Sequence, residues 1–314
     1  MWLFNSSIGR KFIMCLTGAF LVLFVTFHCV MNSVAIFWPA AYNCICEFLG
    51  ANWYALIGTM VLAAGFLLHI IYAFWLTLQN RKARGNDRYA VTSKPPQVEW
   101  ASQNMLVLGI VILAFLAIHG IQFWYKMQFA EITGNLVTCE CGKVVPPAAG
   151  TLFLQMAFGE WYTLPIYLIG FIALWFHMTH GFWSMFQSCG WNGRVWFNRL
   201  KCIANWWTSI VVLLFIAEAV VFTVNAKNQT YLNCPVLQEQ YEEMQAAIAL
   251  EEGEVAPCCA GEVAPCCQQA EGCCAENTCC QGDSCAAGEC CGKCVAEGDS
   301  CCGKCKEIVE SENK

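Results

Sequence analysis

The stretch Phe176-His177-Met178-Thr179-His180-Gly181-Phe182-Trp183-Ser184 places two histidines inside a long apolar segment. Ionisable side chains at membrane depth are costly and rare, so they mark candidate functional sites. The whole chain has only five histidines, and all of them lie inside apolar segments: His28, His69, His119, His177 and His180. This distribution is the main indication of function.

Composition predicts an all-α integral membrane protein. Of the 314 residues, 58% are hydrophobic and 13% are charged, whereas an ordinary soluble domain has about 25% charged residues. A membrane-spanning helix needs about 20 apolar residues, and five segments are long enough: residues 12–38, 52–79, 102–126, 162–187 and 204–225. We therefore expect a five-helix transmembrane bundle over residues 1–226. The chain has no basic patch or phosphate-binding loop that would indicate a nucleic-acid partner.

The remaining residues, 227–314, predict a largely irregular, Cys-rich extension after a short helical stretch at 236–252. Of the 24 cysteines, 15 fall within 258–305, and the motif Gly-Glu-Val-Ala-Pro-Cys-Cys at 253–259 recurs at 261–267. Such a segment has too few large apolar groups to fold on a core of its own. Cys-x-x-Cys units suit zinc, copper(I) or an iron–sulfur cluster, and disulfides are an equal alternative.

Basic residues alternate between loops and predict the orientation of the chain. They gather before the first span, between the second and third, and between the fourth and fifth, whereas the loop at 39–51 has none and the loop at 127–161 has only Lys143. The N-terminus is therefore expected in the cytoplasm and the C-terminus outside. Five cysteines then lie on the oxidising side, where a cross-loop disulfide cap is plausible with its pairing open: Cys44, Cys46, Cys139, Cys141 and Cys234.

Four histidines lie at matched depths. His28, His69, His119 and His177 are each about 15–17 residues into their helices, or about 22–26 Å along a core of about 30 Å. Because the helices alternate in direction, His28 and His119 fall near the outer side, and His69 and His177 fall near the inner side. Two histidines per layer predict two b-type haems with both axial positions filled, which suits electron transfer. The alternative is that each histidine bonds a neighbouring helix. Gly65, one turn before His69, is expected to admit a macrocycle.

Two further motifs strengthen a family resemblance. Ser7-Ile8-Gly9-Arg10-Lys11 is followed by Met14-Cys15-Leu16-Thr17-Gly18, and the histidine stretch continues to Gly190. With the four-histidine pattern, they resemble the dihaem cytochrome b membrane anchor of succinate:quinone oxidoreductases, the single-anchor type of menaquinone-linked succinate dehydrogenases and fumarate reductases. The resemblance covers about residues 1–226 and not the Cys-rich tail.

The resemblance implies which histidines hold iron. His28 and His119 would be the axial ligands of the outer haem, and His69 and His177 those of the inner haem. The ligand in the family motif is the first histidine, and some relatives have asparagine at the second, so His180 is a secondary candidate. Its alternative role is a hydrogen bond to a propionate, a quinone or another helix.

The resemblance also implies partners. The chain would have no catalytic site for succinate or fumarate, because that chemistry belongs to a flavoprotein subunit and an iron–sulfur subunit on the cytoplasmic face. Electrons would pass through the inner and outer haems to menaquinone near the outer face, within the lipid of a bacterial inner (cytoplasmic) membrane.

Two acids are candidates for quinone and proton chemistry. Glu47 precedes the second span on the outer side, and its alternative role is a solvated loop acid. Glu218 lies within the apolar run of the fifth span, where its cost favours a functional role. Two other functions remain open: a cytochrome b subunit of another respiratory oxidoreductase, and a metal-handling membrane transporter with a Cys-rich scavenging tail.

Overall fold

The computed structural model describes residues 6–84, 99–139, 142–191 and 193–251. The predicted all-α class is confirmed, because these residues form helices and no strand beyond one isolated bridge between Thr138 and Val144. The Cys-rich repeats, Cys141 and the metal or disulfide state of the tail lie outside the described residues. The chain divides into two units, residues 1–238 and 239–314.

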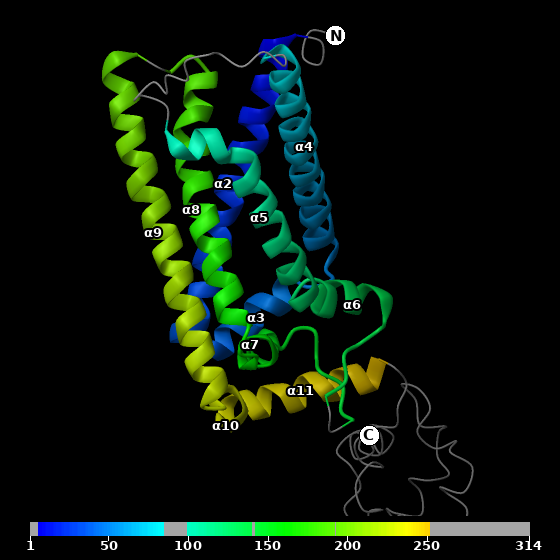
Figure 1. Ribbon diagram of the computed structural model, residues 1–314. Coiled ribbons are helices and arrows are strands. Elements are labelled where there is room, and N and C mark those ends of the chain that lie inside the picture. Colours follow the sequence, from blue (N-terminus) through cyan, green and yellow to red (C-terminus); the bar gives the residue numbers. More distant parts are fainter. Residues whose placement is uncertain (1–5, 85–98, 140–141, 192, 252–314) are drawn as a thin grey trace, which may run out of the picture. The chain divides into compact units, whose positions relative to one another are not determined.

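Five helices in the described residues are long and apolar enough to cross a membrane (Figure 1). They are α2 (Ser7–Phe37), α4 (Trp53–Arg84), α5 (Trp100–Gln122), α8 (Thr163–Ser188) and α9 (Arg194–Lys227). The third candidate span continues from α5 through the π-helix η1 (Tyr125–Phe129) and α6 (Ala130–Thr133). All five predicted spans are present, and α2, α4 and α9 are longer than the apolar runs that predicted them. In lipid only a helix satisfies its backbone polar groups within one segment, which is why apolar length alone finds these elements.

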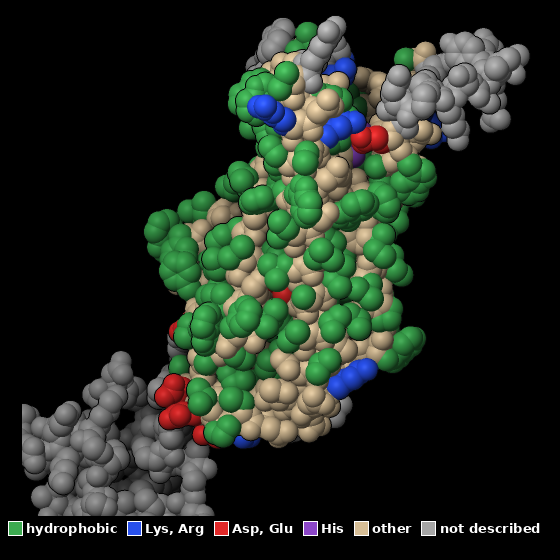
Figure 2. All heavy atoms as spheres, turned by 90° about the vertical axis from the view of Figure 1, so that its left-hand side faces the viewer, with side chains coloured by type: hydrophobic (Ala, Val, Ile, Leu, Met, Phe, Trp, Pro, Cys, Tyr) green, Lys and Arg blue, Asp and Glu red, His purple; other side chains and the backbone are tan. Residues whose placement is uncertain are grey.

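Helix α2 is central to the bundle. Helices α4, α8 and α9 all pack on α2, and α5 packs on α8. The start of α2 is capped by Ser6, whose Oγ accepts a hydrogen bond of 2.9 Å from the backbone nitrogen of Gly9, as serine commonly does at this position. Figure 2 shows hydrophobic side chains over the middle of one face, with Lys and Arg towards its two ends. This surface agrees with a membrane-spanning bundle.

Short helices, and not irregular loops, cover the end at which α2 finishes. Pro39 follows α2 and occupies the first turn of α3 (Pro39–Phe48), where its missing N–H costs nothing. Helix α7 (Gly150–Gly159) packs on α3 and α9. Asn43 Oδ1 accepts hydrogen bonds from the backbone nitrogen and the hydroxyl of Thr151, at 3.0 and 2.8 Å. Helix α10 (Thr230–Asn233) packs on α7 and α9. Helix α11 (Pro235–Glu251) follows it in the chain and matches the expected stretch at 236–252.

The predicted disulfide cap does not run through Cys46 or Cys234, which are both thiols. Cys139 is disulfide-bonded. Cys46 instead packs against Gly150, where an added side chain would collide with its sulfur. Burial raises the pKa of the Cys46 thiol to about 12, so this sulfur is a packing group and not a reactive thiolate.

Candidate functional site

The structure brings the first pair of histidines together. His28 on α2 and His119 on α5 have ring centroids 5.8 Å apart, with the rings nearly perpendicular at 89°. Phe24 stacks on His28 at 5.5 Å, and Phe115 stacks on His119 at 5.8 Å. These aromatic rings hold the two imidazoles in place from their own helices.

The second pair has the same arrangement closer to the other end of the bundle. His69 on α4 and His177 on α8 have ring centroids 6.3 Å apart at 66°. A bond between a transition metal and an imidazole nitrogen is about 2 Å long, so two rings on opposite sides of one ion have centroids roughly 6 Å apart. Both pairs therefore have the separation that a shared axial metal requires.

Each histidine pair joins helices whose backbones do not pack closely on each other. Helices α4 and α8 both pack on α2, and α5 reaches α2 through α8. The imidazoles of each pair thus meet between helices that make few direct contacts with each other.

Thr17 sets the tautomer of His69. The Thr17 hydroxyl donates to the backbone oxygen of Ile13 at 2.9 Å, and its oxygen lies 3.2 Å from His69 Nδ1. Since a hydroxyl has one proton, the oxygen accepts from Nδ1–H, and Nε2 keeps its lone pair. Metal-ligating histidines typically donate their other N–H to such a partner.

Tyr167 does the same for His119. Its hydroxyl donates to Gln122 Oε1 at 2.9 Å and lies 3.1 Å from His119 Nδ1. The ring of His119 is therefore fixed with Nε2 available to a metal. His177 differs, because its Nδ1 is buried and has no hydrogen-bond partner among the described residues.

Two glycines lie next to the rings of the inner histidine pair, and neither of them is Gly65. An added Cβ at Gly18 would lie 3.6 Å from His69 Cε1, and one at Gly109 would lie 3.7 Å from His177 Cε1. At Gly65 an added Cβ would lie 3.0 Å from the ring of Phe20. The described residues contain no cluster of three or more metal-ligating side chains. A haem needs only two, since the porphyrin supplies the other ligands.

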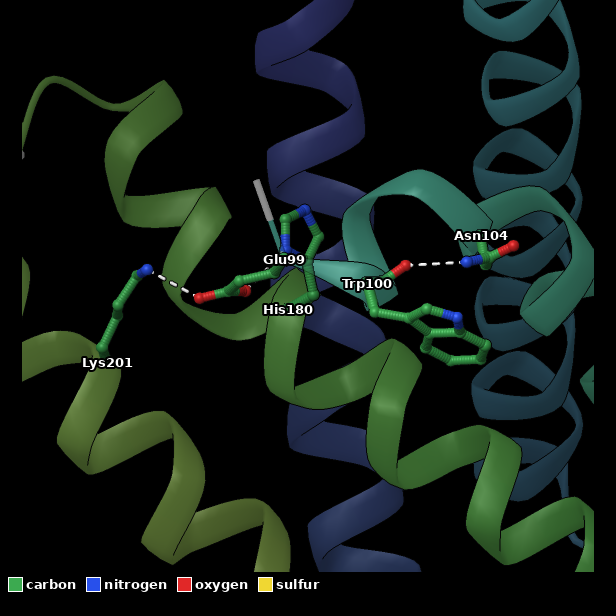
Figure 3. Close-up of polar contacts among 5 residues, drawn as sticks. All are labelled: Glu99, Trp100, Asn104, His180 and Lys201. Atoms are coloured by element: carbon green, nitrogen blue, oxygen red, sulfur yellow. Dashed lines mark hydrogen bonds and ion pairs between the residues drawn. The ribbon is translucent and has the colours of Figure 1, made fainter. Parts of the chain in front are cut away.

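His180 belongs to a separate cluster. Its Nδ1 lies 3.3 Å from Glu99 Oε2, and Lys201 Nζ lies 2.6 Å from Glu99 Oε1. Figure 3 shows Glu99 between these two side chains, which come from α8 and α9. Burial raises the pKa of the Glu99 carboxyl, but the hydrogen bonds from Lys201 and His180 outweigh it and lower the pKa below its ordinary value. Sequence reasoning missed Glu99, because no local pattern links it to residues so far along the chain.

The two candidate acids have different surroundings. Glu218 is only 2% exposed, and its Oε1 accepts a hydrogen bond of 2.7 Å from Ser33 and lies 3.8 Å from Cys29 Sγ. Cys29 adjoins His28, and Phe215, one turn before Glu218, contacts the His28 ring at 6.2 Å. Glu218 therefore lies beside the outer pair. Glu47 is exposed at the end of α3, as its alternative role of a solvated acid would require.

No protein-family model, curated protein or solved structure matches the chain. The class of the protein therefore comes from its fold and its site. It has five helices with the length and composition to span a membrane, and it contains two pairs of facing histidines.

Proposed function

We propose that this chain is the dihaem cytochrome b subunit that anchors a succinate dehydrogenase or fumarate reductase in a bacterial inner membrane. The observation that carries the proposal is the pairing of four histidines from four helices, with ring centroids 5.8 and 6.3 Å apart. Hydrogen bonding of two of these histidines through Nδ1 adds support, because it leaves Nε2 available to iron.

The chemistry of the pairs favours electron transfer over catalysis. A haem held between two imidazoles supplies one-electron redox chemistry. His28 and His119 would hold one haem and His69 and His177 the other, and haems held in this way would supply electron transfer and not binding of oxygen or substrate. The residues of this chain would bind and orient the haems, exclude water from them and set their potentials through the hydrogen bonds of Thr17 and Tyr167.

The proposed partners follow from this role. A flavoprotein and an iron–sulfur subunit would dock on the cytoplasmic face and carry out the dicarboxylate chemistry. Electrons would pass between the iron–sulfur subunit and menaquinone through the inner and outer pairs. Glu218 is the better candidate for a proton-exchanging group near the outer pair, since it is buried there and hydrogen-bonded to Ser33.

An optical spectrum tests the proposal directly. The full chain, purified with haem supplied during expression, should give the reduced-minus-oxidised spectrum of a b-type cytochrome. The pyridine haemochrome should count two haems per chain. A well-folded preparation that contains no haem would overturn the electron-transfer function, and the metal-handling alternative would take its place.

Tyr167→Phe should weaken binding of the outer haem. The change removes the hydroxyl that orients His119 through Nδ1, and loss of such a partner typically costs about 10–100-fold in metal affinity. The rate of haem transfer to apomyoglobin measures this effect. Tyr162→Phe is the matched control at the residue that precedes α8, because Tyr162 is exposed and makes no such contact. Equal transfer rates in the two variants would contradict the role of Tyr167.

A further inference from the structure

Two cysteine thiols lie together where α2 begins and α8 ends. The sulfur atoms of Cys15 on α2 and Cys189 at the C-terminal cap of α8 are 3.2 Å apart, although the two residues are 174 positions apart in the chain. Both cysteines are free thiols. Figure 1 shows these helix ends at the same end of the bundle, and the two helices pack on each other. A disulfide bond is about 2.05 Å long, so the sulfurs need to approach by only about 1.2 Å to be joined.

Hydrogen bonds account for the protons of both thiols. Cys15 Sγ lies 3.2 Å from the backbone oxygen of Met185, to which its S–H donates. A thiol has one proton, so the contact between the two sulfurs is a donation from Cys189 to Cys15. The Cys15 sulfur therefore lies between the last turn of α8 and the Cys189 thiol, and it contacts both.

The end of α8 fixes the position of Cys189. Gly190 has a φ of +84°, a left-handed conformation that favours glycine. The backbone nitrogen of Gly190 donates to the backbone oxygen of Gln187 at 3.1 Å, and that of Trp191 donates to the backbone oxygen of Phe186 at 2.9 Å. These are the two bonds of a Schellman motif, and the stacking of Phe186 on Trp191 at 5.8 Å supplies its usual apolar contact. This turn holds the Cys189 backbone beside α2.

The two thiols differ in exposure. Cys15 is only 9% exposed, whereas Cys189 is exposed, so an oxidant in water reaches Cys189 first. A buried free cysteine often serves as a small apolar packing group, and that role alone accounts for Cys15. It does not account for an exposed thiol that contacts the buried sulfur from another helix. An accessible thiol beside a second, resolving thiol is typical of redox-sensing cysteines.

The compartment at this end of the bundle limits what the pair can do. Basic residues precede α2 and lie between α8 and α9, and they predict that this end faces the cytoplasm: Arg10, Lys11, Arg194, Arg199 and Lys201. Cytoplasmic thiols are normally kept reduced, so a disulfide formed there is transient and redox-sensing. This position favours a reversible disulfide over a permanent structural one.

We propose that Cys15 and Cys189 form a reversible disulfide when a peroxide oxidises the protein. Hydrogen peroxide transfers one oxygen atom to the Cys189 sulfur, which gives a sulfenic acid and one water. The Cys15 sulfur then attacks the sulfenic sulfur. The S–S bond forms, the S–O bond breaks, and the hydroxyl leaves as water with the proton of the Cys15 thiol. A cytoplasmic dithiol restores both thiols by exchange and is itself oxidised to a disulfide.

The disulfide would join α2 to α8 close to the inner histidine pair. Thr17, two residues after Cys15, lies 3.2 Å from His69 Nδ1, and α8 carries His177. A cross-link that closes a long loop removes conformational freedom from the unfolded chain. The oxidised protein should therefore unfold at a higher temperature, and reduction should reverse this shift.

Disulfide mapping tests the site. The full chain, reconstituted in phospholipid nanodiscs, would be treated with hydrogen peroxide, and its remaining thiols would then be blocked by alkylation. Proteolysis without reductant, followed by mass spectrometry, should find Cys15 linked to Cys189, and treatment with a dithiol should remove the link. Absence of this link after peroxide treatment would overturn the proposal. Cys189 linked only to other cysteines would also overturn it.

Cys15→Ser separates the two chemical steps. Without the second thiol the sulfenic acid on Cys189 persists, so dimedone, which reacts with sulfenic acids, should label Cys189 more strongly than in the unchanged chain. Cys202→Ser is the matched control and should keep the link, because Cys202 is an exposed thiol on α9 that bonds to no other sulfur in the part of the chain that the structure describes. Equal labelling of Cys189 in Cys15→Ser and in the unchanged chain would overturn the role of Cys15 as its partner.

Thermal unfolding of the same samples tests the consequence for stability. Peroxide should raise the unfolding temperature of the unchanged chain relative to that of Cys15→Ser. A link without this rise would support the modification site and overturn its stabilising effect. The thiol pair and its test require no haem, so the haem content of the sample reports separately on the proposed function.

Discussion

Replacing His28 with alanine is expected to leave one b-type haem per chain instead of two. A haem that loses one of its two axial imidazoles is held by a single bond, and the facing ring of His119 is its only remaining ligand. His119→Ala should lose the same haem, whereas His69→Ala and His177→Ala should both lose the other. Pyridine haemochrome counts the haem, and a redox titration identifies which of two midpoint potentials remains.

His180→Ala is the control for this series. Its ring contacts Glu99 and Trp183 and faces no other histidine, so both haems should remain. A haem lost in His180→Ala and kept in His177→Ala would reverse the assignment of the inner ligand. Loss of different haems in His28→Ala and His119→Ala would contradict the pairing across α2 and α5.

Gly170→Ala is expected to destabilise the bundle and to loosen the outer haem. A Cβ at Gly170 would lie 2.5 Å from Phe115 Cγ and 2.7 Å from Phe115 Cδ2. The Phe115 ring cannot easily move away from an added Cβ, because three other rings pack around it. The ring centroids of Phe171, Tyr167 and His119 lie 5.7, 5.0 and 5.8 Å from that of Phe115. Overpacking of this kind costs about 1–3 kcal/mol, and displacement of Phe115 also moves the imidazole on which it stacks.

Gly181→Ala is a matched control on the same helix. An added Cβ at Gly181 meets nothing within 4 Å, so the change should be neutral or should stabilise α8 by up to about 1 kcal/mol through helix propensity. Thermal unfolding in detergent, followed by circular dichroism, compares the two variants. If Gly170→Ala unfolds at the same temperature as Gly181→Ala and keeps both haems, that result would contradict the close contact between Gly170 on α8 and the Phe115 ring on α5.

The five helices were predictable from the sequence because the bilayer imposes a simple rule. A spanning segment must be apolar for about 20 residues and must satisfy its own backbone, so hydropathy locates it without knowledge of its neighbours. The depth of a histidine along such a helix follows from the rise of about 1.5 Å per residue. Depth and alternating direction together placed His28 opposite His119 and His69 opposite His177 before any contact was known.

The orientation of each helix about its own axis depends on tertiary packing, and sequence pattern does not determine it. In lipid the apolar faces are chemically alike, so helix rotation is set by which small and polar side chains meet their neighbours. That is why sequence pattern did not show that the ring of Phe20 lies against Gly65.

What the sequence determined by itself was therefore the fold class, the spans and the two histidine layers, because each follows from properties measured along a single helix. Only the tertiary structure decided that Thr17 and Tyr167 hold His69 and His119 through Nδ1. It alone placed Glu99 between His180 and Lys201. These contacts join residues that are 48 to 102 positions apart, and such distant partners meet only when the helices pack.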